Sequence, residues 1–133
     1  MDAEALNKRL VIAPFHRWLG LSVRSASAEG IEIEMPWREE MISNAAIGST
    51  HGGILASLVD LTGVYTLLAA GVRVSATADM HMDYHRPAIR ETVVAQARPV
   101  KIGTRVSVAE TKIVRLDGTL IASGRGAYLS AGS

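Results

Sequence analysis

The sequence contains no cysteine among its 133 residues. This absence excludes a disulfide scaffold, a thiolate zinc site and a catalytic cysteine, and it fits a reducing compartment, so we expect a cytoplasmic protein. A chain of this length buries roughly two-thirds of its unfolded surface on folding, which is enough for one core without covalent staples. We therefore expect a single domain over residues 1–133.

Aromatic residues and net charge are also scarce. Phe, Trp and Tyr make up 5% of the chain, and the formal net charge is +1. Nucleic-acid binding depends on a basic surface and often on aromatic stacking, so we expect no nucleic-acid partner. Residues 1–5 include two acids where a secretory signal has a basic run, so we expect no export signal. The abundant residues are small, with 19 Ala and 12 Gly, which indicates close approach between backbone segments.

The most informative segment is residues 53–70, which are apolar on nearly every side of a helix and contain one charged residue, Asp60. A helix that is apolar all round is predicted to be buried. Asp60, Thr62 and Gly63 interrupt it, and a membrane span needs about 20 consecutive apolar residues, so we expect no membrane partner. The segment is predicted to be the central helix of the fold.

Strand-like segments lie on both sides of this helix. Residues 38–50 have no periodicity and are predicted to form a loop, and residues 4–18 are predicted to form one short helix or two fragments broken at Pro14. Together these elements predict an α+β fold, with an antiparallel sheet of about six strands against one long helix. The predicted strands cover residues 21–27 and 31–35 before the helix, and 75–84, 92–100, 104–115 and 119–129 after it.

Asp60 is the first candidate for chemistry. An unpaired carboxylate in a buried helix costs several kcal/mol or has a raised pKa, and such groups often act on water or substrate. The structural alternative is a carboxylate that caps a neighbouring loop or pairs with an arginine. We favour the functional interpretation.

The second candidate is the turn His51-Gly52-Gly53 at the start of the same helix. Glycines there allow a ligand oxygen to approach free N–H groups at the positive end of the helix dipole. Gly53 and Asp60 share a face, but helical rise separates them by roughly 10 Å. Two such helices packed antiparallel across a two-fold axis would bring the turn of one beside Asp60 of the other, so we expect an obligate dimer with shared sites. Small residues, namely Ala56, Ser57 and Gly63, would permit this packing.

A third candidate is the predicted strand 75–84, where period two places several polar side chains on one face. His and Asp at alternate positions could bind a divalent metal ion. The alternative, which we favour, is a solvated face or a subunit interface, and we expect no metal. The side chains predicted to share the face are Thr77, Asp79, His81, Asp83 and His85.

The His-Gly-Gly turn with Asp60 nine residues after the histidine, together with Asp79-Met80 and Arg86-Pro87-Ala88, resembles the hotdog-fold acyl-CoA thioesterases of the phenylacetate-degradation (PaaI-like) branch. The resemblance covers roughly residues 19–129. It implies a hotdog fold, in which the curved sheet wraps around the helix. It also implies dimers with side-by-side helices and two sites at their interface, and commonly tetramers of two such dimers.

The resemblance also implies roles for individual residues. Gly52 would offer its N–H to the thioester carbonyl, and His51 would support the turn. Asp60 of the opposing subunit would act as general base on water or as nucleophile. Thr77 stands where relatives have a Ser or Thr that orients the water.

Relatives often have an asparagine six residues before this histidine, and it helps to hold the carbonyl. In this sequence that position is Ala45, and Asn44 lies one residue earlier. Either a one-residue bulge returns Asn44 to the site or the contact is missing.

The implied reaction is hydrolysis of an acyl-CoA thioester without a metal or redox cofactor. Gly53 belongs to the expected substrate-binding turn, and the phosphates of coenzyme A need cationic contacts. Two alternatives remain at this stage: a non-catalytic acyl-CoA-binding protein and a hotdog hydratase or dehydratase. The basic residues that could contact coenzyme A are Arg86, Arg98, Lys101, Arg105 and Arg125.

Overall fold

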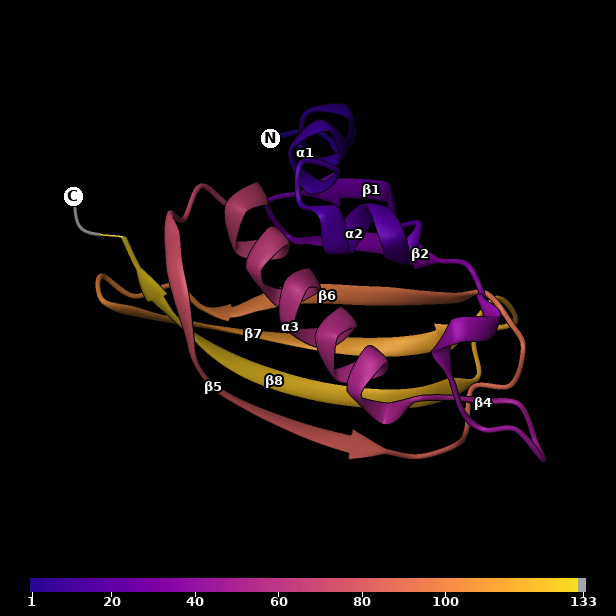
Figure 1. Ribbon diagram of the computed structural model, residues 1–133. Helices are drawn as coiled ribbons and strands as arrows, with labels where there is room; N and C mark the ends of the chain where they lie inside the picture. The colour runs from indigo at the N-terminus through magenta and orange to yellow at the C-terminus, as the bar shows by residue number, and fades with distance from the viewer. Residues whose placement is uncertain (132–133) are drawn as a thin grey trace.

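The computed structural model describes residues 1–131, which form one curved sheet, a long helix on its concave face and two short helices beside it (Figure 1). In chain order the elements are α1 (Ala3–Leu10), α2 (Pro14–Leu19), β1 (Ser22–Ser27), β2 (Gly30–Met35), a 3-10 turn (Glu39–Met41), β3 (Ile42–Asn44), β4 (Ser49–Thr50), α3 (Gly52–Ala69), β5 (Val74–Tyr84), β6 (Val93–Lys101), β7 (Val106–Arg115) and β8 (Leu120–Ser130).

The main sheet has the strand order β1-β2-β6-β7-β8-β5, and every neighbouring pair is antiparallel. This confirms the predicted α+β architecture of six antiparallel strands wrapped around one long helix. Pro14 begins α2, so the N-terminal segment forms two helices. Residues 38–50 are not a plain loop as predicted, because β3 and β4 pair across a short turn. Their ladder is too short to leave a periodic pattern in the sequence.

The core lies between α3 and the concave face of the sheet. In β2 the side chains of Ile31, Ile33 and Met35 are buried, and the glutamates between them face outward, as strand alternation predicts. Each such apolar side chain stabilises the fold by about 1.5–3 kcal/mol through burial. From α3, Leu55 and Leu58 pack into the same cluster.

Helix α3 has the length and hydropathy of a membrane span. In this fold, however, one side of it packs against the sheet, with Leu58 and Thr62 fully buried. His51 caps its first turn, because the Nδ1 atom accepts a hydrogen bond of 2.8 Å from the Gly53 N–H. After its last turn the chain leaves through Gly71, whose φ of 89° lies in the left-handed region. The helix is thus a core element with defined ends.

Glycines allow α3 to lie very close to β8. A Cβ atom at Gly124 would come within 2.8 Å of Val59 on the helix, and one at Gly63 would collide with the Tyr128 ring. Tyr128 is 1% exposed and occupies this space. Gly63 therefore serves the helix-to-sheet contact, and the prediction that it lies between two helices is wrong.

Candidate active site

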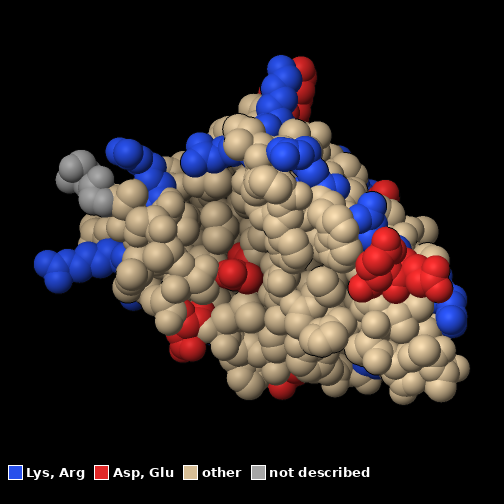
Figure 2. Space-filling view, in the orientation of Figure 1, with Lys and Arg blue, Asp and Glu red and all other residues tan. Residues whose placement is uncertain are grey.

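One face of α3 remains open in the single chain. Gly53, Ser57, Asp60 and Val64 follow one another at helical spacing and are half-buried or exposed. The prediction of a helix buried on every side is therefore wrong for the single chain, because the sheet covers only one side. Figure 2 views this surface: uncharged side chains cover most of it, and most charged ones gather at its margins. Asp60 is the only charged residue that α3 contributes.

Asp60 is held by a residue of the edge strand β5. The Thr77 hydroxyl donates a hydrogen bond of 2.7 Å to the Asp60 Oδ1 atom. The resemblance implied that Asp60 and Thr77 act on the same water, and the structure brings their side chains into contact. The carboxylate is half-buried rather than enclosed, since the open face gives it access to solvent.

Directly after Thr77, the strand β5 departs from simple alternation. The pairing of β5 with β8 shifts register between Thr77 and Asp79. Such an irregularity turns the following side chains to the opposite face. Met80 and Met82 therefore share the helix side with Thr77 and pack against the core.

The predicted common face for Thr77 and the later polar residues of β5 is thus wrong. His81 and Asp83 are exposed and interact with each other, with Nε2 and Oδ1 3.2 Å apart. Within residues 1–131, no group of three or more His, Asp or Glu side chains is arranged to hold a metal ion.

The turn before α3 presents a free donor. Among residues 1–131 no acceptor is paired with the Gly52 N–H, which stands at the positive end of the helix. The Gly53 N–H is different, because it already donates to His51. Of the two glycines, only Gly52 keeps an N–H for a ligand.

Tyr84 at the end of β5 fixes this turn from the other side. Its hydroxyl donates a hydrogen bond of 2.7 Å to the Gly52 carbonyl oxygen. A hollow of about 360 Å³ opens beside it, and Arg86 lies on its rim. Its lining residues are Ser49, Thr50, Gly52, Leu55, Tyr84, His85, Arg86 and Pro87.

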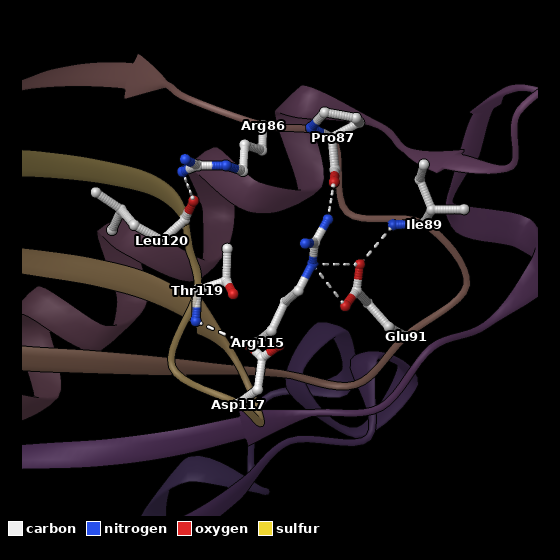
Figure 3. A network of polar contacts seen from close by, with 8 residues as sticks. All are labelled: Arg86, Pro87, Ile89, Glu91, Arg115, Asp117, Thr119 and Leu120. Carbon is white, nitrogen blue, oxygen red and sulfur yellow. Dashed lines mark hydrogen bonds and ion pairs between the residues drawn. The ribbon is translucent and has the colours of Figure 1, made fainter.

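A polar network braces the segment that forms one wall of this hollow (Figure 3). Arg115 contacts both carboxylate oxygens of Glu91, at 3.0 and 3.1 Å, and donates to the Pro87 carbonyl. Arg86 donates to the Leu120 carbonyl at 2.9 Å. No local pattern in the sequence indicates these pairs, because their partners come from distant turns.

Gly52 and Asp60 remain apart within one chain. Eight residues of helix separate them, which corresponds to a rise of about 12 Å. A single thioester carbonyl cannot contact both groups of the same helix.

A comparison with known families identifies the fold. The Thioesterase superfamily matches residues 47–122, which run from the turn before β4 into β8. The chain belongs to the thioesterase superfamily. It is therefore a thioester hydrolase, and the predicted resemblance to thioesterases is confirmed, while its place in the PaaI-like branch stays a prediction.

Three comparisons describe how similar other thioesterases are. The chain is 35% identical over 119 residues to acyl-coenzyme A thioesterase 13 of Homo sapiens, covering 84% of this chain and 81% of that protein. It is 25% identical over 131 residues to the medium/long-chain acyl-CoA thioesterase YigI of Escherichia coli, covering 87% and 84%. A solved structure of a thioesterase-superfamily protein is 44% identical, with a TM-score of 0.89 over 96% of each chain.

Asn44 has a local role in this thioesterase. Its Oδ1 atom accepts a hydrogen bond of 3.0 Å from the Ala46 N–H, and the β3–β4 pairing shifts register beside it. This shift lies between Ile42 and Asn44, not between Asn44 and His51, so it is not the bulge that would return Asn44 to the site. Among the described residues, no hydrogen bond joins Asn44 to His51 or Gly52.

Two of the expected cationic residues lie away from the hollow in the single chain. Arg98 is on the convex side of the sheet, where it pairs with Glu110. Arg105 precedes β7, at the end of the sheet opposite the start of α3 (Figure 1). Of the predicted arginines, only Arg86 lines the hollow beside Gly52.

Proposed function

We propose that this thioesterase hydrolyses acyl-CoA thioesters to a free acid and coenzyme A, at two equivalent sites shared by a homodimer. The observation that carries the proposal is the Asp60 carboxylate, held by Thr77 on the open face of an otherwise uncharged helix. The names of the human and Escherichia coli relatives support acyl-CoA as the substrate class.

The shape of the single chain supports the shared site. The open face of α3 lies beside β5, which is an edge strand with mostly exposed residues. An edge of this length pairs readily with a second strand. Two copies joined along β5 would cover both open helix faces and bring Gly52 of one subunit towards Asp60 of the other.

In the proposed mechanism, the Gly52 N–H donates to the thioester carbonyl oxygen and stabilises the negative charge that develops there. Asp60 of the partner subunit takes a proton from water as the water oxygen bonds to the carbonyl carbon. The tetrahedral intermediate then collapses, the C–S bond breaks, and Asp60 returns the proton to the sulfur of coenzyme A. Thr77 keeps the carboxylate oriented throughout.

His51 and Arg86 support this chemistry without bond changes of their own. The cap from His51 Nδ1 holds the turn at Gly53, while the Gly52 N–H has no acceptor among the described residues. Arg86, on the rim of the hollow, would contact a phosphate of coenzyme A.

The test compares two substitutions at Gly52, one that removes its N–H and one that keeps it. Gly52 is the first residue of α3, a position where proline is well tolerated; proline removes the N–H and adds a ring there. Gly52→Pro is expected to lower kcat by about 100- to 1,000-fold, the usual loss for one oxyanion donor. Gly52→Ala places a Cβ atom at the same point, 3.3 Å from the Tyr84 ring, but keeps the N–H, and should remain within about tenfold of wild type.

Asp60→Asn completes the test, measured by thiol release from a panel of acyl-CoA thioesters. It should abolish turnover while the fold and the oligomer are retained. Wild-type kcat in Asp60→Asn, or equal losses in Gly52→Pro and Gly52→Ala, would contradict the proposed mechanism.

A further inference from the structure

Tyr128 of β8 is a buried phenol whose hydroxyl has a specific partner. The side chain is 1% exposed, and its hydroxyl donates a hydrogen bond of 3.2 Å to the main-chain carbonyl of Asp60. The ring occupies the space above Gly63 and Gly126, where a Cβ atom would collide with it. The hydroxyl lies under the helix turn that carries Asp60.

Thr77 and Tyr128 form a pair on either side of the same residue. They are direct partners in the β5–β8 ladder, so their side chains stand next to each other on the helix side of the sheet. Thr77 binds the Asp60 side chain, and Tyr128 binds the Asp60 main chain. Together they fix both the backbone position and the carboxylate orientation of one helical residue.

We propose that Tyr128 is a positioning residue for hydrolysis. Its hydroxyl holds the main-chain carbonyl of Asp60 and so determines where the Asp60 carboxylate lies relative to Thr77 and the attacking water. This rests on the proposed function of Asp60. Tyr128 does not touch the reacting atoms, because its hydroxyl is used on the carbonyl of the helix. A catalytic side chain must be held within a fraction of an ångström of its productive position, and this requires supporting contacts in addition to the one that the side chain itself makes.

The chemistry of the phenol suits this role. Burial raises the pKa of Tyr128 above its ordinary value of 10, and the nearby negative charge of Asp60 raises it further. The hydroxyl therefore keeps its proton at neutral pH and remains a hydrogen-bond donor. A phenylalanine in the same place keeps the ring and loses only this donor.

The experiment compares Tyr128→Phe with Thr66→Val. Thr66 is fully buried on α3, and its hydroxyl donates to the Ala97 carbonyl of β6 at 3.3 Å, so the control also removes one buried hydroxyl that ties α3 to the sheet. Both variants should lose a few degrees of Tm, about 3–5 °C. Only Tyr128→Phe should lower kcat, by roughly tenfold, with KM within about twofold of wild type.

A double-variant cycle tests whether Tyr128 acts through Asp60. The losses from Tyr128→Phe and Thr77→Val should be non-additive, because both contacts position the same residue.

The outcomes distinguish this inference from the proposed function. Loss of activity in Asp60→Asn with wild-type kcat in Tyr128→Phe overturns the role of Tyr128 alone. Equal losses of kcat in Tyr128→Phe and Thr66→Val also overturn it, since a general loosening of α3 would then explain both. Wild-type activity in Asp60→Asn overturns the proposed function and the role of Tyr128 together.

Discussion

Replacing Gly63 with alanine tests how closely α3 is packed on β8. In an ordinary helix interior, glycine to alanine stabilises a protein by about 0.5–1 kcal/mol. At Gly63 the new Cβ would overlap the Tyr128 hydroxyl and lie 2.7 Å from Cζ of the ring. Overpacking of this kind costs about 1–3 kcal/mol, and the fully buried ring also packs directly against Gly126. The overlap should exceed the gain in helix propensity.

We therefore expect Gly63→Ala to destabilise the fold by about 1–2 kcal/mol, measured by urea unfolding at fixed protein concentration. Its kcat should fall as well, because a helix lifted from the sheet moves Asp60 away from Thr77. Tyr128→Phe removes the atom of closest overlap, so Gly63→Ala should cost less in that background. A Gly63→Ala protein at least as stable as wild type would refute the close packing described for this turn.

Two further predictions concern ion pairs. Arg125 and Arg98 hold the pKa of the Glu110 carboxyl below its ordinary 4.5, so their attraction stabilises the fold at neutral pH and is lost as pH falls below that value. Glu110→Gln should lower Tm at pH 7, and this loss should shrink as the pH is lowered from 4.5 in thermal melts; a loss that stays the same at every pH would contradict this. Arg115→Met removes the brace on Glu91 beside the hollow, so KM for an acyl-CoA should rise by roughly fivefold with little change in kcat. An unchanged KM in steady-state assays would show that the brace does not shape the substrate site.

The main elements were predictable because their signals are local. Alternation in 31–35 and the apolar length of 53–70 reflect the burial of one sheet face and of the helix that packs against it. Other features depend on contacts between distant segments. The register shift after Thr77 arises from the pairing of β5 with β8. Alternation along β5 alone therefore placed Thr77 on the same face as the later polar residues, which is wrong. Gly63 contacts a tyrosine that lies 65 positions later in the chain. The sequence therefore indicated close packing at Gly63 but not the residue against which it packs.

The shared site can be tested without a structure of the dimer, by mixing two inactive variants. In a mixed dimer of Gly52→Pro and Asp60→Asn, one site contains both substitutions. The other site combines the Gly52 N–H of the Asp60→Asn subunit with Asp60 of the Gly52→Pro subunit, and is intact. Random reassociation makes half of the dimers mixed, and each mixed dimer has one intact site of two. About a quarter of all sites should therefore be intact, which restores about a quarter of the wild-type activity.

A site contained within one chain gives the opposite result. Every subunit then carries one substitution, and no mixture can restore activity. The rise of about 12 Å between Gly52 and Asp60 along α3 argues for recovery, because a carbonyl bound at one end of the helix lies beyond reach of a carboxylate two turns further on. Co-expression with two affinity tags isolates the mixed dimer, whose expected kcat per dimer is about half that of wild type. A mixed dimer that is as inactive as its parents would place Gly52 and Asp60 in the same subunit's site, and the open face of α3 would need another explanation.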